Sequence, residues 1–190
     1  MKKSIAALGF FAASFVLVTI LGCAEANAQI LDQGPSFRDL AIKLQTPEDV
    51  AHYMWRHFQF EDDRSNFGRD DHWQKPEEFL TTQKGDCEDF ALFAREVLKM
   101  QGIKCFLLNV YGKRFAHTVC VFKENGKYNV IDGTNVFRFQ AGDIKSLLGK
   151  IYPFWDTGSI VEPAPSSDYG QILTQFERQA KIKQQMPIAA

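Results

Sequence analysis

Residues 85–91 read Gly-Asp-Cys-Glu-Asp-Phe-Ala, and they mark the start of a helix around which the chain is expected to fold. Asp86 is a good N-cap, because its side chain can accept a backbone N–H of the first turn, and Asp89 can reach back as in a capping box. Apolar residues recur at helical spacing as far as Met100. We therefore predict a buried core helix with one reactive thiol, Cys87, at its tip.

The thiol lies between opposing electrostatic influences. The first turn of a helix favours a thiolate, because the partial positive charge and the free N–H groups there stabilise a negative sulfur. The acids around Cys87 act in the opposite direction, and these are Asp86, Glu88 and Asp89. A basic partner is therefore needed to produce a nucleophile.

After this helix the hydrophobic period changes from about 3.6 residues to about 2, which indicates strands. Strands are expected over 103–110, 116–122 and 127–131, with a fourth over 136–139. Asn125-Gly126 is a strong signal for a two-residue hairpin turn between the second and third strands. Helices followed by an antiparallel meander and further helices predict the α+β class.

The hairpin turn predicts which side chains meet. It sets Glu124 opposite Lys127, and it makes His117 and Asp132 diagonal neighbours on one face of the sheet. Their backbones are then about 7–8 Å apart, a gap that a hydrogen bond between imidazole and carboxylate can close. With Cys87 they form a candidate Cys–His–Asp triad, in which the histidine takes the thiol proton and the aspartate orients the ring.

These residues resemble the transglutaminase-like superfamily. The resemblance is carried by residues 85–89, 116–117 and 130–134, which occur in the family's order, and it covers roughly residues 45–135. It implies a papain-like core, in which the nucleophile helix packs on an antiparallel β-meander that carries the histidine and the aspartate. It also implies acyl transfer through a thioester, and hence proteolysis, amide hydrolysis or amide transfer.

The chain also departs from parts of that family. Val119 stands where a Trp often follows the histidine by two positions, and the sequence has no Cys-x-x-Cys pair, which argues against the zinc-carrying peptide:N-glycanase branch. It resembles the small bacterial transglutaminase-like cysteine peptidases, in which acids beside the nucleophile can bind calcium. Asp86 and Glu88 occupy those places, although the simpler role for Asp86 is a helix cap. Calcium takes six to eight oxygens, so two carboxylates supply only part of a site, and no other cofactor is expected.

The sequence also suggests the oxyanion donors and the state of the two strand cysteines, with alternatives for each. The backbone N–H of Cys87 is the natural first oxyanion donor, and Trp73 or Gln74 is a candidate second donor. A turn centred between residues 112 and 113 sets Cys105 opposite Cys120. These two residues form either a cross-strand disulfide or a pair of buried free thiols.

The N-terminal residues read as an export signal. A basic start, an apolar run and small residues indicate a signal peptide over 1–28, cleaved after Ala28. The alternative is a lipoprotein signal that ends before Cys23, which would then be acylated and would anchor the protein to a membrane. In either case residues 29–190 are expected to form a single domain outside the inner membrane, periplasmic or secreted.

Four other segments carry weaker patterns. A helix is predicted from a Thr46 cap, with a buried stripe that includes Trp55. Residues 61–72 read as a solvated surface loop, and residues 156–168 as an extended loop. A C-terminal helical extension is expected over 169–184.

Composition limits the possible partners. The chain has 190 residues, 45% of them hydrophobic and 24% charged, and a formal net charge of −1. This balance gives no reason to expect binding to nucleic acid or to an anionic membrane surface. The first hypothesis is hydrolysis of a protein or peptide in the cell envelope. The alternatives are amide transfer, cleavage of peptidoglycan peptides, and a non-catalytic binding module with the same fold.

Overall fold

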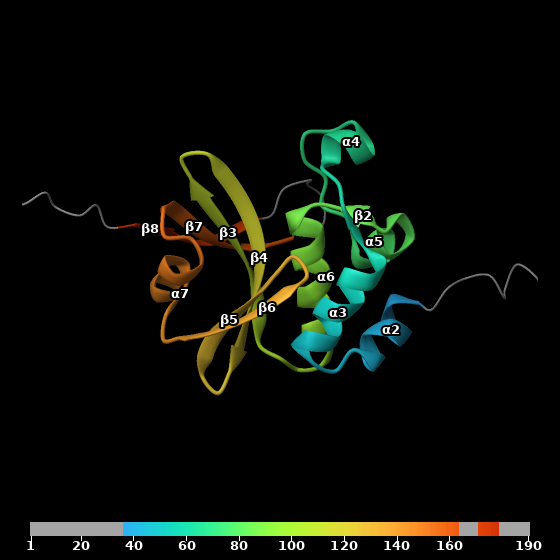
Figure 1. Ribbon diagram of the computed structural model, residues 1–190, viewed down its shortest axis with the longest axis horizontal. Helices are drawn as coiled ribbons and strands as arrows, with labels where there is room; N and C mark the ends of the chain where they lie inside the picture. The colour runs from blue at the N-terminus through green and yellow to red at the C-terminus, as the bar shows by residue number, and fades with distance from the viewer. Residues whose placement is uncertain (1–35, 164–170, 179–190) are drawn as a thin grey trace, which may run out of the picture. The chain divides into compact units, whose positions relative to one another are not determined.

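The computed structural model describes residues 36–163 and 171–178, and its main element is a six-stranded antiparallel sheet with helices on both faces (Figure 1). The strands, in their order across the sheet, are β6 (Asn135–Ala141), β5 (Lys127–Asp132), β4 (Phe115–Glu124), β3 (Cys105–Gly112), β7 (Trp155–Glu162) and β8 (Gln171–Glu177). The helices are α2 (Phe37–Lys43), α3 (Pro47–His57), α4 (Asp63–Phe67), α5 (Pro76–Thr82), α6 (Cys87–Met100) and α7 (Ile144–Ile151). A short parallel pair, β1 (Gln59–Phe60) and β2 (Lys84–Gly85), completes the fold. This architecture confirms the predicted α+β class.

Helix α6 has the predicted bounds and packs on one face of the sheet, with α3 and α5 on its other side (Figure 1). Its apolar face is fully buried at Phe93, Val97 and Leu98. Phe58 and Phe79 extend this core, with their ring centroids 4.1 Å apart. Each such side chain contributes about 1.5–3 kcal/mol on burial, so the core holds the tip of α6 in a fixed place against the sheet.

The opposite face of the sheet is covered by α7, which is capped by Asp143 (Figure 1). Leu147 and Leu148 are fully buried there against Val110 and Val130 of the sheet. Because both faces of the sheet are covered, the central strands have buried side chains on both sides.

The register of β4 and β5 is the predicted one. Glu124 pairs with Lys127, and the ladder continues to Cys120 opposite Ile131. The turn residues 125–126 both have positive φ, 51° at the asparagine and 77° at the glycine, as the two-residue hairpin turn requires.

The predicted register of β3 and β4 is wrong by two residues. Gly112 pairs with Phe115, so the turn lies one residue later than predicted, and Cys120 faces Leu107 rather than Cys105. Gly112 stays in the strand because the Phe115 ring fills the space where its Cβ would be, 2.3 Å from the nearest ring atom. A glycine was expected to turn the chain, but here it lets an aromatic ring lie against the backbone.

The predictions for the C-terminal part are also wrong where the structure describes it. Most of the expected loop over 156–168 is β7, which pairs with β3. The expected helix over 169–184 is β8 over Gln171–Glu177, which pairs with β7. The spacing of apolar residues in this short segment suits a helix or a strand. It forms a strand because its backbone can pair with the edge strand β7.

The N-terminal helix α3 agrees with its prediction except for the burial of one side chain. Thr46 caps α3 as predicted, and it forms a capping box with Asp49. Met54 is buried as expected, but Trp55 is 65% exposed and does not belong to the buried stripe. The structure adds α2, in a segment whose residues carry no strong pattern. The predicted export signal and Cys23 lie outside the described residues.

Candidate active site

His117 and Asp132 meet on the face of the sheet that carries Val119 and Val130, which belong to the core beneath α7. His117 lies on β4 and Asp132 ends β5, and their Nε2 and Oδ1 atoms are 2.7 Å apart. Both side chains are partly exposed, at 28% and 25%. The predicted diagonal pair is therefore a hydrogen bond in the structure.

The Cys87 thiol lies against the same part of β4. It is the first residue of α6, and its sulfur accepts a backbone hydrogen bond from Thr118, the residue after His117. Its Sγ also lies 3.1 Å from Oε2 of Glu88, to which the thiol donates. The fold thus brings the helix tip to the strand segment that carries the imidazole.

The surroundings of Cys87 favour the neutral thiol. Burial raises its pKa well above the ordinary value, and the charge and hydrogen bond of Glu88 raise it further. The Thr118 backbone N–H acts in the opposite direction. A base is therefore required to take the proton before the sulfur can attack a carbonyl.

Asp132 is held in its charged form. Burial opposes its ionisation, but the hydrogen bond and charge of His117 and the hydrogen bond of Tyr152 outweigh it, so the pKa of Asp132 lies below its ordinary value. A carboxylate can only accept hydrogen bonds, so Nε2 of His117 carries the proton of that bond. In the neutral imidazole, Nδ1 is then free to accept a proton.

Tyr152 is a member of the site that the sequence analysis missed. It follows α7, and its hydroxyl donates to Oδ2 of Asp132 at 2.8 Å. Its ring lies edge-on to His117, with the ring centroids 5.8 Å apart. No local motif announces this residue, because only the packing of α7 on the sheet brings it to Asp132.

Gln74 supports the tip of α6 rather than serving as an oxyanion donor. It is 1% exposed, and its backbone N–H and side-chain Nε2 donate to the two oxygens of Asp89, at 2.8 and 2.6 Å. The same Nε2 donates to the backbone oxygen of Lys84. Because these donors are all in use, the prediction for Gln74 is wrong. Trp73 is partly buried against the core, and its predicted role stays a prediction.

The segment before α5 is largely exposed as expected, but it contains helix α4 and one buried acid. Asp63 is only 2% exposed and accepts a hydrogen bond from the backbone N–H of His72. Its oxygens, together with those of Asp71, Asp86, Glu88 and Asp89, form overlapping groups whose ligand atoms lie within 4.8 Å of one another. The sequence singled out only Asp86 and Glu88, because the contribution of the loop depends on its tertiary placement.

Burial and mutual repulsion disfavour charge in this cluster. Burial, followed by the charge of Asp86, raises the pKa of Asp63 to about 6. Burial and the interaction with Asp86 raise the pKa of Glu88 to about 10. Burial raises the pKa of Asp89 to about 7, although its bonds from Gln74 oppose the rise.

Two oxygens of the cluster support a cation site. Oδ1 of Asp63 and Oδ1 of Asp86 are buried and, within the described part of the chain, have no hydrogen-bond partner. Buried carboxylate oxygens without partners are costly, and a hard cation such as calcium is bound by oxygens of this kind. The residues present therefore fit calcium, with more ligands than the sequence had indicated.

Cys105 and Cys120 are free thiols in the structure. They are diagonal neighbours on β3 and β4 rather than directly opposed, because of the two-residue difference in register. Cys105 donates to the backbone oxygen of Arg95, and Cys120 is fully buried. The structure therefore agrees with the free-thiol alternative and not with the predicted direct opposition.

Comparisons with known proteins agree with this fold. The model of the Transglutaminase-like domain family matches residues 38–141. Calcium-bound Legionella pneumophila LapG is similar in structure, with 20% sequence identity and a TM-score of 0.48 over 69% of this chain and 78% of that one. A protein of Cytophaga hutchinsonii, provisionally described as a cysteine protease, has 13% identity and a TM-score of 0.41 over 73% and 48% of the two chains. A TGase has 21% identity and a TM-score of 0.37 over 55% and 30%. The search of curated proteins gave no match.

Proposed function

Because the chain belongs to the transglutaminase-like domain family, we propose that it is an exported thiol peptidase in which Cys87 attacks an amide carbonyl of a protein or peptide. The observation that carries the proposal is the 2.7 Å hydrogen bond between His117 and Asp132, beside a strand residue whose backbone contacts the Cys87 sulfur. A base, the group that orients it and a thiol at a helix N-terminus are the parts that thioester chemistry needs.

The reaction assigned to these groups has two halves. Nδ1 of His117 takes the thiol proton as the Cys87 sulfur bonds to the carbonyl carbon, and the imidazolium then gives the proton to the departing amine as the C–N bond breaks. Water, deprotonated by the same nitrogen, next attacks the thioester and releases the acid and the free thiol. Asp132 stabilises the imidazolium and keeps the ring in one orientation. The Cys87 backbone N–H is the proposed oxyanion donor, with Trp73 as a candidate second group.

We also propose calcium as a structural ligand of the acidic cluster. Asp63, Asp86, Glu88 and Asp89 would hold it with Asp71, and the two unpartnered buried oxygens of Asp63 and Asp86 support this assignment. A bound divalent cation would offset the negative charge beside the thiol. No transfer of a proton or acyl group is assigned to the ion.

The proposed compartment is the cell envelope. The support is the sequence of residues 1–28, which reads as a signal peptide, with the lipid anchor at Cys23 as the alternative. Among the residues that the structure describes, no helix combines the length and the apolar character needed to cross a membrane. The expected substrate is accordingly a protein or peptide of the envelope.

Thiol labelling combined with peptide hydrolysis tests the proposal. In calcium-containing buffer, iodoacetamide is expected to react fastest at Cys87, and this rate should fall in His117→Ala but not in His52→Ala, an exposed histidine away from the site. Cleavage of casein peptides, followed by mass spectrometry, should be lost in Cys87→Ser. Equal, slow labelling of all described cysteines with no cleavage would instead indicate a non-catalytic binding module. Attachment of added amines without net hydrolysis would indicate amide transfer.

A further inference from the structure

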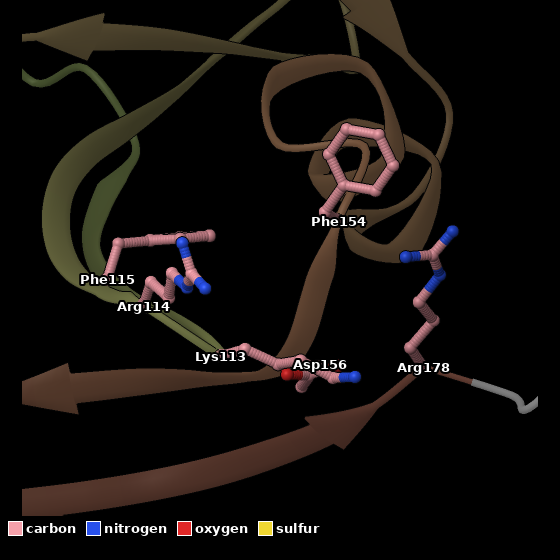
Figure 2. Close-up of a pocket in the computed structure, with 6 residues that line it drawn as sticks. All are labelled: Lys113, Arg114, Phe115, Phe154, Asp156 and Arg178. Atoms are coloured by element: carbon pink, nitrogen blue, oxygen red, sulfur yellow. The ribbon is translucent and has the colours of Figure 1, made fainter.

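A pocket lies beside the candidate site and has no role in the chemistry described above. It has a volume of about 540 Å³. Three separate segments line it: the β3–β4 turn with the start of β4, the stretch that leads into β7, and the residue after β8 (Figure 2). The lining residues are Lys113, Arg114, Phe115, Phe154, Asp156 and Arg178.

The charge of the pocket is strongly one-sided. Lys113, Arg114 and Arg178 are cationic and exposed, against the single carboxylate of Asp156. Within residues 36–163 and 171–178, none of these three cations is in an ion pair. In Figure 2 the two arginine side chains lie on different sides of the space, and Phe154 lies above it. The planar guanidinium group of an arginine can bind a carboxylate with two parallel hydrogen bonds.

The pocket also carries aromatic surface. Phe154 is 79% exposed, an unusual state for a large apolar side chain, and Phe115 is partly buried at the opposite wall. Phenyl rings next to guanidinium groups can contact the apolar part of a peptide while the cations bind its carboxylates. The lining therefore suits a polypeptide segment that contains both acidic and apolar side chains.

Two aromatic side chains in contact lie between the pocket and the candidate triad. The ring centroid of Phe115, which lines the pocket, is 5.6 Å from that of Tyr152. Tyr152 in turn donates to Asp132 and lies against His117. Figure 1 shows the β3–β4 hairpin on one side of the start of α6 and α4 on the other.

We propose that this pocket is a substrate subsite for an acidic segment of the polypeptide, adjacent to the bond that is cleaved. The inference rests on the proposed function and adds the chemical class of substrate to it. The net charge of −1 on the whole chain disfavours nucleic acid or an anionic membrane as the occupant.

A binding measurement on the Cys87→Ala protein tests the inference without any need for turnover. The probes are two fluorescein-labelled peptides of equal length, one alternating Glu and Phe and the other alternating Lys and Phe, followed by fluorescence anisotropy. The acidic peptide is expected to bind about tenfold or more tightly than the basic one, because like charges across an interface are repelled. Affinity should decrease with added salt.

Charge reversal locates the binding. The double substitution Arg114→Glu/Arg178→Glu should lower the affinity for the acidic peptide by about tenfold or more, because attraction between opposite charges becomes repulsion between like charges. The matched control Arg38→Glu/Arg56→Glu changes two exposed arginines elsewhere and should leave the affinity unchanged. Phe154→Ala, at an exposed position that folding does not depend on, should also weaken binding. Circular dichroism checks that each variant is folded.

Several outcomes would overturn the inference. These are equal binding of the two peptides, unchanged binding in both the charge-reversal and the Phe154→Ala proteins, and binding only to vesicles of anionic phospholipid. Failure of the proposed function has a different signature, because it is read from cleavage and thiol labelling by the wild-type protein. Loss of cleavage with retained, pocket-dependent peptide binding would contradict the peptidase and leave a peptide-binding site.

Discussion

At the scale of single residues, the neighbours of the Cys87 thiol act on its proton in opposite directions. Burial and Glu88 raise its pKa, and the Thr118 backbone N–H lowers it. A thiol in these surroundings is a poor nucleophile by itself, so its reactivity depends on how well His117 is placed to accept the proton. The side chains that hold the imidazole therefore matter as much as the thiol.

Tyr152→Phe tests this dependence on placement. The change removes the hydroxyl that donates to Asp132 and keeps the ring that lies against His117. We expect kcat to fall about tenfold or more, because a hydrogen bond to a charged group contributes about 1.5–3 kcal/mol. The pKa of Asp132 should rise when this donor is lost, so activity should be lost at a higher pH as the solution is acidified.

The pH–rate profile for peptide hydrolysis is the measurement that separates positioning from folding. Tyr53→Phe is the matched control, since its ring packs on Phe58 and Phe93 in the core, away from the site. An unchanged acidic limb in the Tyr152→Phe protein would contradict the positioning role.

At the scale of elements, the tip of α6 is held by a hydrogen-bonded unit that leaves no free space. Gln74 binds both oxygens of Asp89, and Asp89 also accepts a bond from the backbone N–H of Asp86. Gly85 passes directly beside this unit: a Cβ there would lie 2.2 Å from Oδ2 of Asp89 and 2.7 Å from Nε2 of Gln74. The glycine before the nucleophile is thus required by packing and not only by turn geometry.

Gly85→Ala is therefore expected to lower both Tm and activity. The added methyl group must displace the buried Gln74–Asp89 pair, and breaking a buried hydrogen bond to a charged group costs about 1.5–3 kcal/mol. Gly142→Ala is the control, because a Cβ at Gly142 meets nothing within 4 Å. Thermal unfolding followed by circular dichroism measures the difference, and an equal, small effect of the two substitutions would refute the packing argument.

At the scale of the whole molecule, the acidic cluster links distant segments and makes stability depend on pH. The pKa values of Asp63 and Asp89 rise from 3.8 to about 6 and about 7 on folding. The folded protein then holds more protons than the unfolded chain between about pH 4 and pH 7, so these groups make stability decrease as the pH rises through that window. Asp132, with its lowered pKa, acts in the opposite direction at lower pH.

Asp63→Asn tests the cluster and the proposed calcium together. Without calcium, the substitution removes a buried charge, so Tm at neutral pH should rise and its decrease between about pH 4 and pH 6 should become smaller. With calcium, the wild-type protein should be stabilised by about 2.7 kcal/mol at a concentration one hundred times Kd, and this gain should be lost in the variant.

Differential scanning calorimetry with calcium and with a chelator measures both effects. Glu77→Gln, at an exposed position of α5, is the control and should behave as the wild type. A calcium-induced rise in Tm that persists in Asp63→Asn would contradict the assigned ligand.

The sequence by itself determined the parts of the protein that depend on local rules. The capping pattern around Asp86 set the start of α6, and the two-residue turn after Glu124 set the register that joins His117 to Asp132. Helix caps and hairpin turns act over a few residues, so their outcome can be read from the residues themselves.

Only the tertiary structure decided the features that need two distant segments to meet. The edge of the sheet made β8 a strand instead of the expected helix, and the ring of Phe115 kept Gly112 in its strand. The approach of the loop to α6 buried Asp63 in the acidic cluster, and the end of α7 brought Tyr152 to Asp132. Burial, edge pairing and charge density depend on what lies across the fold, and that information is not contained in any single stretch of the chain.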